Sequence, residues 1–175
     1  MTIEFDINES TEISGVYIMR PSVSEDGRGN IWTSFLKDKV EGFLPDDMFF
    51  KHDKFSASKW NVLRGIHGDT KSWKLVTCVH GEVQQVVVDM RKDSPTYKQW
   101  QDFIISRDNQ QLILIPPNMG NAYYVKSSEA VYHYKLAYSG DYIDADEQFS
   151  VKWNDNTIGI NWMCKNPILS NRDEK

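Results

Sequence analysis

One histidine in the sequence stands among residues that suit proton transfer beside an anion. His67 lies in the stretch LRGIHGDTKSWK, between Gly65 and Gly68, with Arg64 before it and Lys74 after it. Glycines allow another backbone segment to approach closely, and the two cations favour an anionic substrate or a developing enolate. Because an imidazole titrates near neutral pH, we interpret His67 as a candidate general base. The remaining histidines lack this setting and are expected to be structural: His52, His80 and His133.

A metal site is the first alternative interpretation of His67. Double-stranded barrels that bind a metal usually carry two closely spaced histidines, a glutamate and a later histidine. This chain has no His-x-His pair, and the next histidine is His80. Where the later ligand would stand, the stretch PPNMGNAYYV has Asn121. We therefore expect no metal, and the lack of a glycine-rich dinucleotide fingerprint predicts no redox cofactor.

The composition predicts one globular domain over residues 1–175. The chain is 40% apolar and has a net charge of −5, which is typical of a soluble folded protein. This mild acidity argues against a nucleic-acid partner, which needs clustered Lys and Arg. No apolar run in the sequence is long enough to span a membrane, and the N-terminus lacks the regions of a signal peptide. The two distant cysteines, Cys78 and Cys164, are expected to be reduced thiols of a cytoplasmic protein.

The elements that position these residues are predicted to be mostly strands. Short segments rich in β-branched and aromatic residues recur between Gly, Pro, Asn or Asp, and this pattern predicts an all-β sandwich or barrel. The turns HGE and SSEA are expected to join hairpins, and only KVEGFLPDDM and ISRDNQ suggest a helical turn. The segment from about residue 145, which carries Trp153 and Trp162, is expected to dock on the barrel. The predicted strands cover residues 15–20, 30–35, 61–67, 74–81, 82–90, 98–106, 111–117, 121–128 and 130–140.

The alternation of side chains along a strand sorts the candidate residues by face. In VYHYKLAY, the residues Tyr132, Tyr134, Leu136 and Tyr138 share one face, which forms either a core layer or the wall of a ligand cavity. In KLVTCVH, Lys74 begins a face that is otherwise suited to burial. Because an unpaired buried ammonium is costly, this lysine is expected at a rim or beside an anion.

Eight segments in order resemble the blocks of one known family, the nucleotide-sugar 3,5-epimerases. They are DGRGNIW, NVLRGIHGD, WKLVTCVHGEV, VVVDMRKDSPTYKQW, IPPNMGNAYYV, YHYKLAYSGDY, WNDNTIGINW and ILSNRD. The similarity runs from about Gly15 to Asp173. Its details, RGIHGD and GNAYYV above all, are closest to a branch that acts on GDP-linked 4-keto-heptoses in capsule synthesis.

The resemblance implies a fold and a set of roles. The fold is a metal-free cupin jelly roll, usually a homodimer with an active site in each barrel. The block RGIHG implies His67 as the catalytic base, ILSNRD implies Asp173 as its partner, YHYK implies Tyr134 as the catalytic tyrosine, and WKLV implies Lys74 beside the keto oxygen. The implied substrate-binding residues are Arg28, Arg64, Asn121, Lys54, Ser56 and Tyr138. Arg28 and Arg64 would hold the diphosphate, and Arg28 would do so by reaching into the neighbouring subunit. Tyr138 would line the nucleotide end of the site.

The chemistry of these residue types agrees with the implied reaction. Epimerisation beside a ketone removes a proton from carbon and returns one to the opposite face. That reaction needs a base near neutral pKa with a carboxylate to orient it, a cation near the enolate oxygen and a proton donor across the ring. Taken without the resemblance, Tyr134 would be interpreted as a core tyrosine and Asp173 as a solvated tail residue.

Three departures from the family pattern leave the substrate open. The usual His-Tyr-Gln is His67-Gly68-Asp69 here, a common histidine is replaced by Asn121, and a Gln and an Asn are replaced by His52 and Lys54. These changes affect the walls around the sugar and diphosphate more than the reaction type. Inversion at C3 alone or at C3 and C5, and a GDP or a dTDP substrate, remain alternatives. So do a sugar-nucleotide 3,4-ketoisomerase and a non-catalytic sugar-nucleotide-binding cupin.

Overall fold

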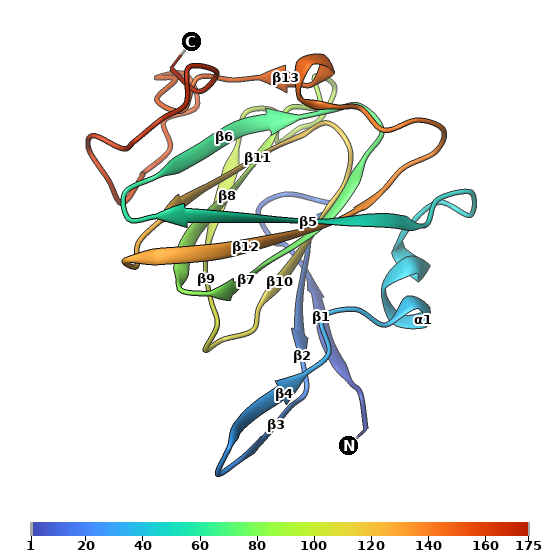
Figure 1. Cartoon of the computed structure of the whole chain (residues 1–175). Coiled ribbons are helices and arrows are strands. Elements are labelled where there is room, and N and C mark those ends of the chain that lie inside the picture. Colours follow the sequence, from blue (N-terminus) through green and yellow to red (C-terminus); the bar gives the residue numbers. More distant parts are fainter. Residues whose placement is uncertain (1, 175) are drawn as a thin grey trace.

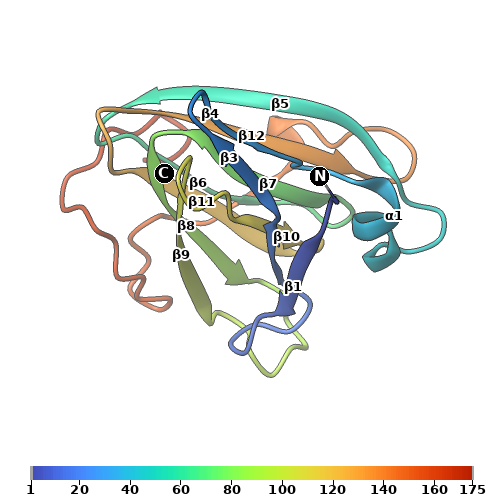
Figure 2. The ribbon, with the colours of Figure 1, turned by 90° about the horizontal axis from the view of Figure 1, so that it is seen from below.

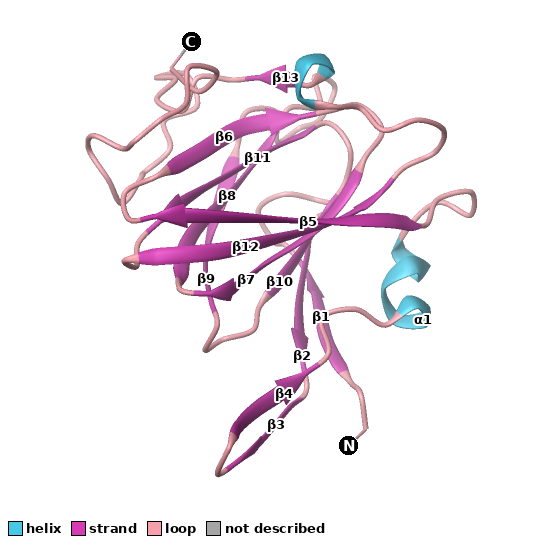
Figure 3. Cartoon of the chain, in the orientation of Figure 1, coloured by secondary structure: helices cyan, strands magenta, loops and turns pink. Residues whose placement is uncertain are grey.

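The computed structural model describes residues 2–174, and nearly all of its regular structure is β-strand (Figures 1 and 3). A six-stranded antiparallel sheet has the order β1-β2-β10-β7-β12-β5. Its strands are β1 (Phe5–Glu9), β2 (Tyr17–Pro21), β5 (Phe50–Lys59), β7 (Trp73–His80), β10 (Leu112–Ile115) and β12 (Glu129–Ala137). A five-stranded antiparallel sheet has the order β13-β6-β11-β8-β9. Its strands are β6 (Leu63–Gly68), β8 (Glu82–Asp89), β9 (Trp100–Ser106), β11 (Met119–Val125) and β13 (Phe149–Ser150).

The remaining elements are short and lie outside the two sheets. They are a separate hairpin of β3 (Val23–Asp26) and β4 (Gly29–Trp32), the helix α1 (Lys37–Val40), and the 3-10 turns η1 (Glu41–Phe43) and η2 (Ala145–Glu147). No helix among residues 2–174 is both long and apolar enough to cross a membrane. The two sheets form the jelly roll of the cupin fold, so the predicted fold class is confirmed.

The core lies between the two sheets. Val76, Cys78 and Ile113 from the six-stranded sheet pack in one cluster with Val87 and Tyr123 from the five-stranded sheet. A second cluster covers the outer face of the six-stranded sheet beneath α1. Alternation along the strands therefore buries residues in both directions, as expected for sheets that are covered on both faces.

The segment after β12 covers the outer face of the five-stranded sheet. Val86 and Val88 of β8 point to that face and pack with Ile158 and the partly buried Trp162. Strand β13 in this segment pairs with β6 through Phe149 opposite Gly68. These contacts bring the C-terminal residues to the same end of the barrel as β6 (Figure 1).

Some predicted elements differ from the observed ones. A helical turn near residues 39–48 is present as α1 and η1, but residues 107–109, in the other predicted helical region, form only a turn. Both predicted hairpins are wrong, because β7 and β8, and likewise β11 and β12, belong to different sheets. The turns at Gly81 and Ser127 therefore carry the chain across the barrel. Strands β1, β3, β5 and β13 were not predicted, although β5 has ten residues and is the edge strand beside β12.

Candidate active site

A cavity of about 400 Å³ opens between the strands of the two sheets. Eight of the ten sequence-predicted site residues line it: Lys54, Ser56, Arg64, His67, Lys74, Asn121, Tyr134 and Asp173. They come from β5, β6, β7, β11, β12 and the C-terminal tail. The fold therefore gathers residues that are up to 119 positions apart in the sequence, from Lys54 to Asp173, around one space.

The two glycines beside His67 fit β6 between its neighbours. A Cβ on Gly65 would lie 2.6 Å from the Asn121 carbonyl oxygen, and the backbone there has a φ of +117°, which side chains rarely adopt. A Cβ on Gly68 would lie 2.2 Å from the Met119 carbonyl oxygen. Since neither distance leaves room for a side chain, glycines on both sides allow β6 to carry His67 into the cavity beside β11.

His67 forms a pair with a buried carboxylate. Its Nε2 lies 2.6 Å from Oδ1 of Asp173, and Ser170 Oγ donates to the other carboxylate oxygen at 2.7 Å. Burial acts to raise the pKa of Asp173, but the hydrogen bonds from His67 and Ser170 outweigh it and hold that pKa below its usual value. An ionised carboxylate only accepts hydrogen bonds, so Nε2 carries the proton of the neutral ring and Nδ1 carries the lone pair. The lone pair faces Ser150 Oγ at 3.0 Å, and this nitrogen is the one that can act as a base.

Tyr134 and Lys74 add a proton donor and a cation to the same cavity. Burial, reinforced by neighbouring Tyr123, raises the pKa of Tyr134 well above its usual value, so its hydroxyl stays protonated and can donate. Burial also lowers the pKa of Lys74, against an opposing effect of Asp69, whose Oδ2 lies 3.6 Å from the Lys74 Nζ. The prediction that this lysine meets an anion is confirmed.

Polar contacts fix the other predicted binding residues on the cavity wall. Arg64 Nε donates to Ser58 Oγ at 3.0 Å, and Lys54 Nζ donates to the Tyr142 hydroxyl at 2.8 Å. The Tyr123 hydroxyl donates to Ser56 Oγ at 3.0 Å. Gln85 donates to the side-chain oxygen of Asn121 at 2.5 Å, so the residue that replaces a family histidine is held by the core.

Two predicted binding residues lie outside the cavity of this chain. Tyr138 follows the end of β12, beyond a register shift at Ala137, and its hydroxyl meets His52 Nδ1 at 3.1 Å instead of the cavity. Arg28 lies at the tip of the β3–β4 hairpin and pairs with Asp26 at 2.5 Å. The hairpin extends away from the barrel in Figure 1 and therefore lies in front of it in the view from below (Figure 2). Face alternation does not apply to Tyr138 because the regular strand has ended. The hairpin that carries Arg28 pairs with no other strand within residues 2–174.

Sequence reasoning missed several residues of the cavity wall. They come from the loop after β12 and from the tail: Tyr142, Asp144, Gln148, Ser170 and Arg172. Phe55 and Leu136 also line the cavity, the latter on the face that alternation indicated. The missed loop residues have no periodic pattern, and only their closeness in sequence to Tyr138 or Asp173 could have suggested them.

The other histidines lie outside the cavity. His133 Nε2 meets Asp53 at 2.6 Å on the opposite face of β12, and His80 meets Glu129 at 3.3 Å on the surface. Within residues 2–174, no three His, Cys, Asp or Glu side chains come together in a group that could hold a metal ion.

The chain is similar to known proteins over nearly its whole length. Residues 10–175 match the model of the dTDP-4-dehydrorhamnose 3,5-epimerase family. The chain is 36% identical over 167 residues to dTDP-4-dehydrorhamnose 3,5-epimerase of Salmonella typhimurium, covering 93% of this chain and 90% of the relative. It is 31% identical over 165 residues to dTDP-4-dehydrorhamnose 3-epimerase of Streptomyces niveus, covering 93% of this chain and 78% of the relative.

A solved structure has the same fold. The 3,5-epimerase of Legionella pneumophila in complex with dTDP-4-keto-L-rhamnose superposes with a TM-score of 0.88 at 33% identity, covering 97% of this chain and 90% of that one. Both the family model and the relatives span nearly the whole barrel, including the residues that line the cavity. The chain therefore belongs to the dTDP-4-dehydrorhamnose 3,5-epimerase family of isomerases.

Proposed function

We propose that this protein epimerises a 4-keto sugar nucleotide at C3 through proton transfer by His67 and Tyr134. The observation that carries the proposal is the joint presence of the His67–Asp173 pair, Lys74 and Tyr134 around one cavity. A base with a lone pair, a cation and a protonated phenol are the groups that epimerisation beside a ketone requires.

In the proposed reaction, Nδ1 of His67 removes the proton from C3. The C–H electrons form the C3–C4 double bond, and the carbonyl electrons move to the oxygen, which becomes an enolate stabilised by Lys74. Asp173 stabilises the imidazolium that forms. Tyr134 then returns a proton to the opposite face of C3 while the enolate returns to the ketone. The cycle ends when the tyrosinate regains a proton and the imidazolium loses one to solvent.

We propose a GDP-linked 4-keto-heptose as the substrate, in capsular polysaccharide synthesis. The support for this finer assignment is the similarity of RGIHGD and GNAYYV to the branch acting on such sugars. The relatives named above act on dTDP-linked sugars, so a dTDP-4-keto-6-deoxyhexose is the matched competitor. Inversion at C5 would require the sugar ring to turn and present C5 to the same base. The isotope-exchange experiment described below distinguishes inversion at C3 alone from inversion at both carbons.

We also propose that the single-domain subunits form a homodimer in which Arg28 reaches the partner's cavity and contacts the diphosphate. The hairpin that carries Arg28 exposes Val23 (42%) and Ile31 (68%), and an isolated two-stranded hairpin is marginally stable in water. Light scattering on the eluted protein should give twice the mass of the chain. Arg28→Ala should raise KM for the nucleotide sugar, and a monomer with normal KM would contradict this proposal.

The test of function is isotope exchange in D2O followed by NMR of the ring protons. The enzyme is incubated with the GDP-4-keto-heptose and, separately, with the dTDP-4-keto-6-deoxyhexose. Deuterium at C3 alone indicates a 3-epimerase, and deuterium at C3 and C5 indicates a 3,5-epimerase. A product whose carbonyl has moved to C3 would indicate the ketoisomerase. Absence of exchange with any 4-keto sugar nucleotide would reject the enzymatic proposal and leave a binding protein.

A further inference from the structure

A buried carboxylate lies directly behind the lysine of the cavity. Asp69 follows β6, two residues after His67, and is only 3% exposed. Its Oδ1 accepts hydrogen bonds from the backbone nitrogens of Lys71 at 3.0 Å and Ser72 at 2.6 Å. Its Oδ2 is buried and accepts no hydrogen bond. One oxygen therefore fixes the β6–β7 turn, and the other is left facing Lys74.

Lys74 itself is 7% exposed and lines the cavity. Its neighbours across β7 are apolar, Leu136 on β12 and Ile115 on β10. The Asp69 Oδ2 lies 3.6 Å from Nζ, close enough for a strong charge interaction and longer than a normal hydrogen bond. The ammonium therefore keeps its N–H groups for whatever occupies the cavity.

We propose that Asp69 is a positioning residue that keeps Lys74 charged and directed at the enolate oxygen. A buried ammonium loses its proton more easily than a solvated one unless an opposite charge compensates. The amide of a glutamine, which the family pattern has at this place, carries no such charge. This inference rests on the proposed epimerase function and adds a residue to its machinery.

Other titratable groups share the cavity and have to be separated from Lys74 in any pH experiment. They are the His67–Asp173 pair, Arg64 on β6, Lys54 on β5, Tyr134 on β12, the loop residues Tyr142 and Asp144, and Arg172 of the tail. Among the described residues, Asp69 is the group whose charge raises the pKa of Lys74 against the effect of burial. Loss of the Asp69 charge should therefore act on the alkaline limb of the pH profile and leave the acidic limb in place.

The experiment compares the pH dependence of kcat/KM for C3 exchange in the wild type and in Asp69→Asn. The asparagine oxygen can still accept the two backbone hydrogen bonds, so the turn is preserved. We expect the alkaline limb of Asp69→Asn to move to lower pH by about one unit or more, and activity at pH 8.5 to fall about tenfold or more. Ser72→Ala, which removes a buried hydroxyl without a hydrogen-bond partner, serves as the control and should leave the profile unchanged.

A second variant identifies the group that titrates. In Asp69→Asn combined with Lys74→Arg, the guanidinium stays charged at every accessible pH, so the alkaline limb should return to high pH even if the rate is lower. If Asp69→Asn lowers kcat/KM equally at all pH values, Asp69 has a structural role only and the inference is wrong.

One further measurement does not depend on how Asp69→Asn folds. NMR of 13C-labelled lysines in the wild type, assigned with Lys74→Met, reports the charge of Lys74 directly. A neutral Lys74 at pH 7.5 would also overturn the inference. Failure of the proposed function is distinguishable, because the wild type would then show no exchange at all.

Discussion

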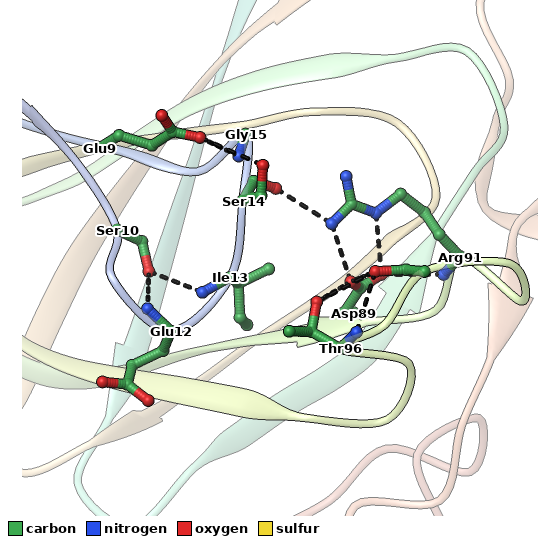
Figure 4. A network of polar contacts seen from close by, with 10 residues as sticks. Glu9, Ser10, Glu12, Ile13, Ser14, Gly15, Asp89, Arg91 and Thr96 are labelled. Carbon is green, nitrogen blue, oxygen red and sulfur yellow. Dashed lines mark hydrogen bonds and ion pairs between the residues drawn. The ribbon is translucent and has the colours of Figure 1, made fainter.

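Two buried carboxylates, Asp173 in the cavity and Asp89 outside it, show how the same physical arrangement can suit proton transfer at one place and stability at another. Asp89, fully buried at the end of β8, accepts a bidentate pair from Arg91, with Nε at 2.9 Å and Nη2 at 2.8 Å. The hydroxyls of Ser94 and Thr96 each donate to it at 2.6 Å, and Figure 4 shows Thr96 and Arg91 beside this carboxylate. Burial acts to raise the pKa of Asp89, but these hydrogen bonds outweigh it and lower the pKa to about 2.

The difference lies in the partner. Arg91 is charged at every pH at which the protein folds, and its Nη2 also donates to the Ser14 carbonyl at 3.0 Å, which ties the loop after β8 to the N-terminal segment (Figure 4). Asp173 instead faces His67, an imidazole that can gain and lose a proton and whose ring lines a cavity. A carboxylate paired with a permanently charged arginine stabilises the fold, whereas a carboxylate paired with an imidazole forms a pair that can take up a proton and release it.

Replacement of the imidazole should have the largest effect. His67→Asn removes the base, so C3 exchange should fall by about 10² to 10⁴-fold, the usual contribution of a general base. His80→Asn, a change to a surface histidine that pairs with Glu129, is the matched control and should keep wild-type exchange. Full activity in His67→Asn would show that another residue is the base.

Replacement of Asp89, the carboxylate paired with Arg91, should lower stability and leave activity unchanged. Asp89→Asn leaves the Arg91 charge without its partner, and because the Arg91 side chain is 32% exposed, the loss of unfolding free energy should be about 2–3 kcal/mol, below the range for a fully buried pair. Urea unfolding at pH 7 measures this loss. Exchange per folded molecule at low temperature should stay within about twofold of wild type, since Asp89 lies outside the cavity. A stable but inactive Asp89→Asn would break the contrast between the two carboxylates.

Tyr134→Phe should separate two halves of the reaction. Because the phenol supplies the second proton, inversion at C3 should fall about 10²-fold, while wash-in of deuterium at C3 by His67 should fall much less. NMR of recovered substrate and product measures both in one sample. Equal losses of inversion and wash-in would mean that Tyr134 binds the sugar without donating a proton.

The pH dependence of stability should distinguish Asp89 directly. The pKa of Asp89 is about 2 in the folded protein and about 3.9 in an unfolded chain, so its folded value is depressed. The resulting stabilisation, about 2.6 kcal/mol, is fully present above the unfolded value and is lost as the pH falls through 4 towards 2. The difference in unfolding free energy between wild type and Asp89→Asn should therefore be constant from pH 5 to 7 and shrink below pH 4. A difference that persists unchanged at pH 3 and below would contradict this assignment.

The parts of the fold that the sequence could predict are those that local chemistry determines. Strand β8 is a run of β-branched residues between turn residues, and β6 is marked by glycines that leave room for its neighbours. Strand β5 was missed because its charged residues suit an edge strand and not the usual apolar pattern. The predicted hairpins failed because a turn such as Gly81 determines where a strand ends, and only the packing of two sheets determines which sheet receives the next strand.

The site divides in the same way. Lys74 and Tyr134 sit within regular strands, so alternation assigned each of them to a face. Alternation left a core layer and a cavity wall as alternatives for Tyr134, and the family resemblance indicated its role. Asp173 is in an irregular tail, and only the family resemblance indicated it. Tyr142 and Arg172 approach the cavity from loops whose path depends on docking against the barrel, and no pattern in the sequence reports that path.

Replacement of Ser150 should have the smallest effect and tests which nitrogen of His67 acts as the base. This serine too was missed from the sequence, and its hydroxyl lies 3.0 Å from Nδ1 of His67 and accepts from Arg172 Nε at 3.3 Å. If Nδ1 carries the lone pair, the hydroxyl donates to it in the resting enzyme, and this hydrogen bond has to open before the nitrogen can take a proton from carbon. Ser150→Ala removes a competitor for the lone pair together with a support for the ring.

The net change should be small, about two- to tenfold in kcat/KM, the range of one neutral hydrogen bond. Ser150→Ala should also raise the basicity of His67, because its neutral form loses a donor, and the acidic limb of the exchange profile should move to higher pH. An acidic limb that moves to lower pH would mean that the serine accepts a proton from Nδ1. In that case the nitrogen facing Asp173 would be the base, and the contrast between Asp89 and Asp173 would need a different explanation.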